Sequence, residues 1–295
     1  MSTEAIDPRF QGLECWPTEQ AVRAMLGVQA HAIEALRGQT SAIADAAEAA
    51  ATRLGTAGRL AYAGAGTSGR IGVQDGVELT PTFGWPERRL AFLVAGGPGA
   101  LMRAVEGAED DAEAGRAAVS AEAIGLGDVL IGIAASGRTP FVLAAVKAAR
   151  DAGAVTVGLS NNPDTPLLTA ADYPILADTG PEVLAGSTRM GAGTAQKAAL
   201  NLLSTAIMLR LGFVHAGRMV NMRISNAKLA IRARTMVEDL GRVDAATAAA
   251  ALEAAGGEIG RAVLIARGVT PDEAARLLKA QDGRLGGALE ALGDA

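Results

Sequence analysis

The chain has 295 residues, of which 49% are hydrophobic, and its formal net charge is −5. This apolar content supports a large folded core and excludes intrinsic disorder, and an acidic chain without a basic patch is a poor match for nucleic acid. The single cysteine, Cys15, excludes an intrachain disulfide. Two histidines, His31 and His215, are too few to favour a zinc site or a Ser-His-Asp triad.

The first residues lack the basic head and apolar core of a signal peptide, and no run of about eighteen apolar residues follows. We therefore expect a soluble protein of the cytoplasm, without a membrane segment.

Residues 1–17 contain two prolines, Pro8 and Pro17, which predict an irregular arm before a long helical stretch over residues 18–54. Beyond it, short apolar runs alternate with Gly/Ser turns and Ala-rich segments. This rhythm is typical of βαβ units and predicts an α/β fold with a parallel sheet covered by helices on both faces. The five predicted strands span residues 59–64, 90–95, 128–134, 155–159 and 173–177.

Helices dominate the pattern after Arg189, with an apolar helix predicted over residues 194–211 and a more polar one over 220–239. The apolar helix should be buried, either inside the fold or in a dimer interface. In the tail, Asp244 and the Thr270-Pro271 pair occupy positions typical of helix starts. The predicted parts are an N-terminal arm and helix (1–50), an α/β domain (51–214), a connecting helix (215–240) and a small helical domain (241–295).

The first predicted strand runs into a glycine-rich turn, Gly64-Ala65-Gly66-Thr67-Ser68-Gly69-Arg70. Its spacing fits the dinucleotide fingerprint G-x-G-x-x-G. However, a dinucleotide site also needs an acidic residue at the end of the second strand, and residues 90–97 contain none. A P-loop is excluded as well, because no Lys-Ser/Thr pair closes the turn.

A similar turn, Ala135-Ser136-Gly137-Arg138-Thr139-Pro140, follows the third strand, so that Ser-Gly-Arg occurs twice between a strand and a helix. Helix starts offer unpaired N–H groups and partial positive charge, and two of them at one sheet edge would suit a phosphate. The alternative is that these hydroxyls only cap helices. A third turn, Gly186-Ser187-Thr188-Arg189, either lines the same pocket or simply interrupts the chain.

Acid–base chemistry on a sugar requires paired carboxyl groups. Glu78 lies near the end of the helix that follows the first turn, and Glu109 follows the second strand. Spacing alone does not separate Glu109 from its neighbours Glu106 and Asp110.

Five motifs, taken in order, resemble those of the N-acetylmuramic acid 6-phosphate etherases, members of the sugar isomerase (SIS) superfamily. The likeness covers residues 50–240 closely and the C-terminal helical module more loosely. It implies a five-stranded, flavodoxin-like three-layer sandwich. The motifs are Gly64–Arg70, Glu78-Leu79-Thr80-Pro81-Thr82-Phe83-Gly84, the segment 104–110 with Glu-Gly-Ala-Glu, the segment 132–140, and Gly191-Ala192-Gly193-Thr194-Ala195-Gln196-Lys197.

The resemblance implies elimination of D-lactate from N-acetylmuramic acid 6-phosphate in cell-wall recycling, with Glu78 and Glu109 as the catalytic carboxyl groups and Glu106 in a structural role. It implies no metal or organic cofactor, a sugar phosphate as ligand and a homodimer that shares pocket residues. Lys197 either reaches the substrate or pairs with a nearby acid. The expected sugar-phosphate ligands are Gly66, Thr67, Ser68, Gly69, Ser136, Gly137, Arg138, Thr139, Ser187, Thr188 and Lys197.

Two other functions share the expected phosphate grip: a sugar phosphate isomerase and a noncatalytic sugar-phosphate-binding regulator. The chain also departs from the family pattern at three places: Leu79-Thr80 where Cys-Pro is usual, Gly191 where Lys is usual, and the segment 213–221. None of these departures falls on the two glutamates or the Ser-Gly-Arg turns.

Overall fold

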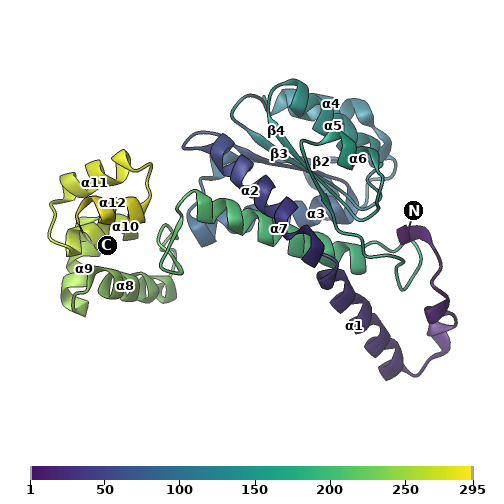
Figure 1. Ribbon diagram of the computed structural model, residues 1–295, viewed down its shortest axis with the longest axis horizontal. Coiled ribbons are helices and arrows are strands. Elements are labelled where there is room, and N and C mark those ends of the chain that lie inside the picture. The colour runs from purple at the N-terminus through teal and green to yellow at the C-terminus, as the bar shows by residue number, and fades with distance from the viewer. Residues whose placement is uncertain (1, 294–295) are drawn as a thin grey trace. The chain divides into compact units, whose positions relative to one another are not determined.

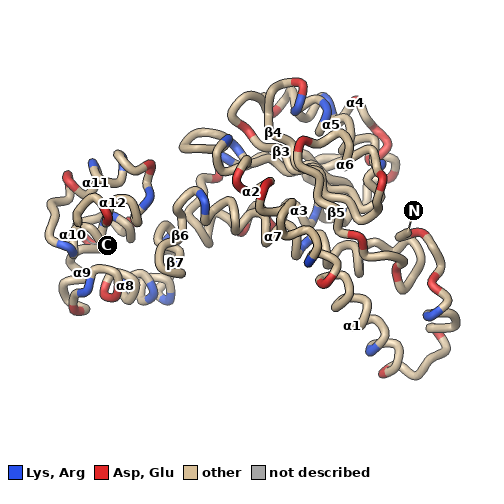
Figure 2. Tube along the Cα trace, viewed as in Figure 1, with Lys and Arg blue, Asp and Glu red and all other residues tan. Residues whose placement is uncertain are grey.

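The computed structural model describes residues 2–293, which form two compact units. The first unit comprises Met1–Gly76 and Arg88–Ala206, and the second comprises Val77–Glu87 and Ile207–Ala295. No helix among the described residues is both long and apolar enough to cross a membrane. Acidic and basic residues are interspersed along the chain of both units (Figure 2).

The first unit contains a parallel five-stranded sheet in the order β2-β1-β3-β4-β5. All five predicted strands are confirmed, each displaced by one residue at one end. This agreement arises because each strand is a short apolar run bounded by turn residues. The strands are β1 (Leu60–Gly64), β2 (Leu90–Val94), β3 (Val129–Ala134), β4 (Val155–Ser160) and β5 (Tyr173–Leu176).

Helices cover both faces of this sheet (Figure 1). One face packs against α4 (Ala112–Ala121), α5 (Pro140–Asp151) and α6 (Pro166–Ala170). Apolar side chains fill that layer, including Leu130, Val142, Val146 and Leu167, each fully buried. The other face packs against α2 (Thr40–Leu54) and against the first-unit parts of α3 (Gly66–Phe83) and α7 (Gly191–Arg210). The expected three-layer α/β sandwich is confirmed.

Close packing of α3 on the sheet depends on two glycines. A Cβ atom on Gly72 would lie 2.9 Å from the Ile133 Cδ1 atom, and one on Gly76 would lie 2.5 Å from the Phe92 Cε1 atom. Both distances are shorter than van der Waals contact, so larger residues here would push the helix away. These glycines therefore keep the start of α3 at the carboxyl edge of the sheet.

The N-terminal region contains more structure than the sequence predicts. The arm forms three short 3-10 helices, η1 (Ser2–Glu4), η2 (Pro8–Phe10) and η3 (Leu13–Cys15). The predicted helical stretch over residues 18–54 is interrupted, because α1 (Thr18–Glu34) ends before the 3-10 helix η4 (Arg37–Gln39) and α2 follows it. Gly38 lies at this break, and glycine is a poor residue for a helix interior.

The second unit is helical apart from the short hairpin of β6 (Val214–His215) and β7 (Arg218–Met219). The helix predicted from residue 220 starts only at Ala227, because the Asn226 side chain accepts a hydrogen bond from the Leu229 N–H group and caps it there. The predicted caps Asp244 and Thr270 are confirmed. The helices are α8 (Ala227–Gly241), α9 (Ala245–Ala254), α10 (Ile259–Ala266), α11 (Pro271–Ala280) and α12 (Leu285–Ala291).

Candidate active site

A pocket of about 460 Å³ lies at the carboxyl edge of the sheet in the first unit. The turns after β1 and β3 and the segment 186–188 contribute to its wall, as do the acidic segment 109–110 and the N-terminal arm. The third turn, whose role the sequence left open, therefore reaches this pocket through Gly186 and Thr188. The expected site residues that line it are Gly66, Thr67, Ser68, Glu109, Ser136, Arg138, Thr139 and Thr188.

The first turn is shaped by three glycines. Gly66 has a φ of +54°, in the left-handed region that favours glycine. A Cβ atom on Gly64 would lie only 2.7 Å from the Gly69 Cα atom, so the strand end and the first turn of α3 pass in direct backbone contact. Gly69 thus permits the turn, whereas Thr67 and Ser68 present hydroxyl groups at the pocket.

The bonds of the second turn show whether its hydroxyl residues serve as helix caps. Thr139 occupies the N-cap position of α5, yet its side chain makes no cap hydrogen bond. Ser136 Oγ accepts a bond from the Arg138 N–H group at 3.2 Å, which leaves the serine hydroxyl proton for another acceptor. Gly137 has a φ of +61°, and a Cβ atom there would lie 2.3 Å from Thr165 Oγ1. Capping alone therefore does not account for Thr139.

The third turn is held by a buried carboxylate. Glu182, with 1% of its surface exposed, accepts hydrogen bonds from the Gly191 and Ala192 N–H groups at 2.9 and 2.8 Å. It thus satisfies the donors at the start of α7, where its negative charge also suits the helix dipole. The Gly193 N–H group donates to Thr188 O at 2.9 Å, which ties the turn to the same helix start. Thr188 faces the pocket, and Ser187 is not one of the described residues that line it.

The acidic segment separates into different environments. Glu106, Glu109 and Asp110 are all exposed, but only Glu109 and Asp110, which belong to the 3-10 helix η7 (Ala108–Asp110), are among the described residues that line the pocket. Asp111 accepts a hydrogen bond from the Ala114 N–H group at 2.8 Å and caps α4. Within this segment, the residues that line the pocket are therefore Glu109 and Asp110, not Glu106.

Two of the expected site residues, Glu78 and Lys197, are not among the described residues that line the pocket. Glu78 is exposed on α3, belongs to the second unit and is not one of the described residues that line this pocket. Lys197 Nζ donates to Asn201 Oδ1 at 2.6 Å, and Asn201 Nδ2 in turn donates to Asp75 Oδ1 at 2.7 Å. The direct partner of Lys197 is thus an amide, which links it to Asp75, and both expectations for Lys197 stay predictions.

Asp75 is the centre of a buried polar network beneath α7. It is 5% exposed and accepts hydrogen bonds from the Tyr62 hydroxyl at 2.9 Å and the Ser204 hydroxyl at 3.1 Å, in addition to the Asn201 amide. Burial raises the pKa of Asp75, although these three hydrogen bonds and the charge of Lys197 oppose the shift. The network joins α3, α7 and β1 and so fixes the helix that starts at the pocket.

Two pocket features were not found from the sequence. Glu4 of the N-terminal arm lines the pocket, and Asn162, the second residue after β4, holds the arm in place. An asparagine pair that ends a buried strand is a signal for a polar role at the carboxyl edge. Nothing in the local pattern of the arm indicates that Glu4 reaches this edge.

The fold and this pocket define the chain as a SIS-domain protein. Residues 112–206 match the SIS domain, and residues 40–150 match the glucokinase regulatory protein N-terminal SIS domain. Among solved structures, a Bacteroides fragilis protein described as a phosphosugar isomerase involved in capsule formation superposes with a TM-score of 0.53. It is 21% identical in sequence, and the match covers 68% of this chain and 95% of that one.

Relatives that match nearly the full length of the chain identify its family within this class. The chain is 48% identical to the N-acetylmuramic acid 6-phosphate etherase of Deinococcus radiodurans, over 95% of this chain and 92% of the relative. It is 46% identical to the etherase of Rubrobacter xylanophilus, over 94% of this chain and 93% of that one. The chain belongs to the N-acetylmuramic acid 6-phosphate etherase family.

Proposed function

We propose that the protein cleaves the D-lactyl ether of N-acetylmuramic acid 6-phosphate and releases N-acetylglucosamine 6-phosphate and D-lactate. The observation that carries this proposal is the 48% identity to a relative of that name over nearly all of both chains. The reaction would belong to cell-wall recycling in the cytoplasm. The pocket supports it, because its hydroxyl-lined turns and an acidic side chain lie together at one sheet edge.

The chemistry needs acid–base groups and no cofactor. In the open-chain sugar, the aldehyde at carbon 1 makes the proton at carbon 2 acidic. Its removal allows the bond between carbon 3 and the lactyl oxygen to break as a double bond forms between carbons 2 and 3. Lactate leaves with a proton from an acid. Water then adds its hydroxyl group to carbon 3 and a proton returns to carbon 2, so that atoms balance.

The phosphate would bind at the two Ser-Gly-Arg turns, where the starts of α3 and α5 meet the pocket. Ser68, Ser136 and Thr139 offer hydroxyl donors, and the helix starts add partial positive charge. The phosphate is remote from the reacting carbons, so its binding energy would serve to position them.

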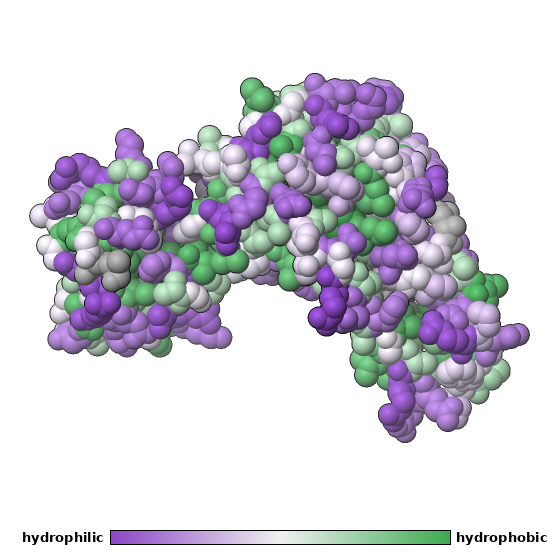
Figure 3. Space-filling model, viewed as in Figure 1, coloured by the Kyte–Doolittle hydropathy of each residue, from purple (hydrophilic) through white to green (hydrophobic). Residues whose placement is uncertain are grey.

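We assign removal of the carbon 2 proton to Glu109 and lactate protonation and water activation to Glu78. Glu109 would act from the pocket that it lines, and we propose a homodimer in which Glu78 of the neighbouring subunit completes the site. Apolar side chains also reach the surface along α1 (Figure 3), where Val22, Leu26 and Ile33 are 52%, 66% and 56% exposed. Such a surface is suited to burial against a second copy.

The reaction is tested by incubating the purified protein with N-acetylmuramic acid 6-phosphate and assaying D-lactate. Lactate release separates the etherase from a sugar phosphate isomerase and from a noncatalytic regulator, neither of which produces it. In water labelled with heavy oxygen, the label should enter the sugar at carbon 3. Label found in lactate would contradict the elimination mechanism.

The shared site is tested by co-expressing the inactive variants Glu78→Gln and Glu109→Gln in equal amounts. If each site combines Glu109 of one chain with Glu78 of its partner, mixed dimers contain one intact site, and about a quarter of wild-type activity returns. If both groups act within one chain, no mixed site is intact and activity stays absent. Each variant purified alone is the control.

A further inference from the structure

The N-terminal arm is fixed to the carboxyl edge of the sheet by Asn162. This asparagine is 1% exposed, and its Nδ2 atom donates to Thr3 Oγ1 at 3.0 Å and to Ala135 O at 2.9 Å. Its Oδ1 atom accepts from Ser2 Oγ at 3.0 Å and from Thr3 N at 3.4 Å. Both the oxygen and the nitrogen of this buried amide have hydrogen-bond partners. Because breaking such bonds in a buried site is costly, the arm has a defined position.

The same arm also holds the third turn of the pocket. Thr3, which is fully buried, accepts a hydrogen bond at its carbonyl oxygen from the Gly186 N–H group at 2.9 Å. One residue of the arm therefore connects Asn162 after β4 with Gly186 in the pocket wall, and Asn162 in turn bonds Ala135 after β3. Three segments that border the pocket are joined through Thr3 and Asn162.

Glu4 follows this anchor and lines the pocket. Its carboxylate lies beside Gly186, since a Cβ atom there would be 2.8 Å from Glu4 Oε2. Gly186 has a φ of +77°, so this close approach occurs at a position that favours glycine in any case. Glu4 is exposed, and over residues 2–293 its carboxylate has no hydrogen bond or ion pair, whereas Thr3 next to it is bonded through its N–H group, its carbonyl oxygen and its hydroxyl oxygen.

Different residues of the arm anchor it and face the pocket. Thr3 accounts for the position of the arm, and the Glu4 carboxylate adds no bond to it. An ionised carboxylate is a hydrogen-bond acceptor only, so its partners in a sugar are hydroxyl and amide N–H groups. The same charge disfavours a phosphate near it.

We propose that Glu4 positions the sugar in the pocket and sets its orientation. Its carboxylate accepts hydrogen bonds from hydroxyl or N–H groups of the hexose, and its negative charge opposes binding of the phosphate next to Gly186. Glu4 takes no part in proton transfer at carbons 2 and 3. The inference rests on the proposed function for its substrate, and on the pocket geometry for the carboxylate.

The test uses Glu4→Ala and Glu4→Gln in the full chain, with Glu14→Gln as the control. Glu14 is an exposed glutamate of the same arm outside the pocket lining, so its variant changes the net charge equally. We expect Glu4→Ala to raise KM on the order of tenfold with kcat changed less than about twofold. Glu4→Gln, which keeps one acceptor, should raise KM less.

A second readout is binding of inorganic phosphate, measured by calorimetric titration without turnover. Removing the negative charge should tighten phosphate binding several-fold in both Glu4 variants and leave it unchanged in Glu14→Gln. A residue that only supports the arm would lower the melting temperature and weaken phosphate binding. Thr3→Val, which removes one of the two acceptors of the Asn162 amide N–H groups, should show that structural pattern.

Unchanged KM together with unchanged phosphate affinity in Glu4→Ala would overturn the inference, as would a Glu4 phenotype equal to that of Thr3→Val. A failure of this inference can be distinguished from a failure of the proposed function. If the unsubstituted protein released no D-lactate, the etherase activity would be contradicted, whereas the phosphate titration would still decide whether the Glu4 charge acts on an anion in this pocket.

Discussion

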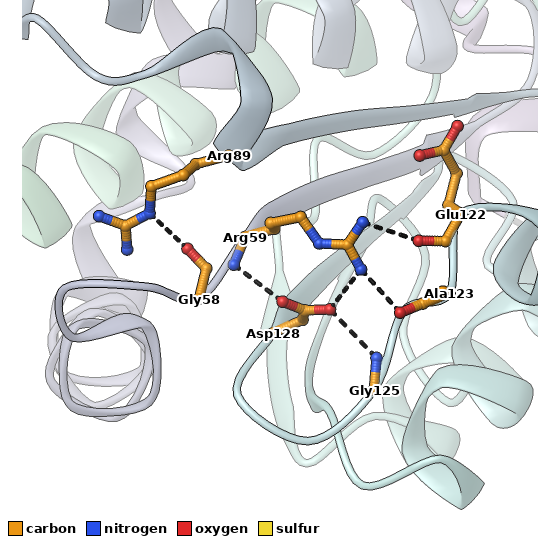
Figure 4. Close-up of polar contacts among 7 residues, drawn as sticks. All are labelled: Gly58, Arg59, Arg89, Glu122, Ala123, Gly125 and Asp128. Carbon is orange, nitrogen blue, oxygen red and sulfur yellow. Dashed lines mark hydrogen bonds and ion pairs between the residues drawn. The ribbon is translucent and has the colours of Figure 1, made fainter.

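The two edges of the central sheet use their polar groups in opposite ways. At the amino edge, where β1 and β3 begin, charged side chains bond one another and the ends of helices and turns (Figure 4). At the carboxyl edge, Glu4 and Thr139 face a pocket, one without a bond within the described chain and the other without the cap bond its position allows. Polar groups at the amino edge thus bond one another, whereas at the carboxyl edge these two side chains face the pocket without such bonds.

The ion pair between Arg59 and Asp128 closes the amino edge. Asp128 accepts hydrogen bonds from the Arg59 N–H group and from Arg59 Nη2, both at 2.8 Å, and from the Gly125 N–H group at 3.1 Å. The Arg59 guanidinium also donates to Glu122 O and Ala123 O, each at 2.7 Å (Figure 4). A 7% exposed carboxylate with this many donors is a structural group.

Arg89 caps α2 at the same edge. It is 6% exposed and donates from Nε to Gly58 O at 2.7 Å and from Nη2 to Leu54 O and Gly55 O, both at 3.0 Å. Burial, with a smaller effect of the Arg88 charge, lowers the pKa of Arg89 to about 10. Arg89 therefore stays protonated at neutral pH, and its charge suits the C-terminal end of a helix.

The largest effect is expected at the carboxyl edge. Glu109→Gln should lower kcat about a thousandfold, because the proposed general base is lost, while the melting temperature stays unchanged. Glu106→Gln is the control, since Glu106 is exposed outside the pocket lining. D-lactate release and thermal denaturation provide the two readouts. An equal loss of activity from Glu106→Gln would contradict the assignment, and Asp110→Asn would show whether the neighbouring acid is the base.

A substitution at the amino edge should lower stability and leave kcat unchanged, the reverse of the effect expected for Glu109→Gln. Arg89→Met should lower the free energy of unfolding by about 3 kcal/mol, because three carbonyl groups lose a charged donor in a buried site. The kcat of the folded fraction should remain as in the wild type. Arg88→Met, at the exposed neighbouring position, should change stability little. Denaturant titration measures this effect, and a greater loss from Arg88→Met would contradict it.

Two helices begin with a Thr-Pro pair and allow a matched comparison, with smaller expected effects. Thr139 precedes Pro140 without a side-chain cap bond, whereas Thr270 precedes Pro271 and accepts from the Glu273 N–H group at 3.3 Å. Thr139→Val should raise KM on the order of tenfold and leave stability unchanged. Thr270→Val should cost about 1 kcal/mol of stability and leave KM unchanged. Similar stability losses in both variants would mean that Thr139 is an ordinary cap.

The smallest effect concerns acid pH. Burial tends to raise the pKa of Asp128, but hydrogen bonds from Arg59 and Gly125 outweigh it and hold the pKa below the ordinary value of 3.8. Its stabilisation is therefore complete above that value and is lost as pH falls through the lowered pKa. Asp128→Asn should be less stable at neutral pH and lose less on acidification below 3.8. Melting curves over this range measure it, with exposed Asp45→Asn as the control.

Most features that depend on contacts between residues close in sequence were predicted, whereas those that depend on contacts between distant residues were missed. The strands followed from apolar runs and their turns, and Asp244 and Thr270 from local capping patterns. The helix start at Ala227 was missed because the pattern extends to residue 220, although Asn226 is a strong cap. Glu4 was missed because the bond between Thr3 and Asn162 joins residues that are 159 positions apart. The catalytic roles and the four-part division stay predictions.

The absence of a side chain at Gly137 has a consequence for adapting this pocket to other sugars. Any larger residue there would collide with Thr165, so the backbone of the second turn is a fixed frame. Directed evolution of substrate preference would have to vary the surrounding positions, such as Glu4, Ser136 and Thr188, while the bonds of the opposite sheet edge maintain the scaffold. Mutant libraries confined to these neighbours should retain a high fraction of folded members.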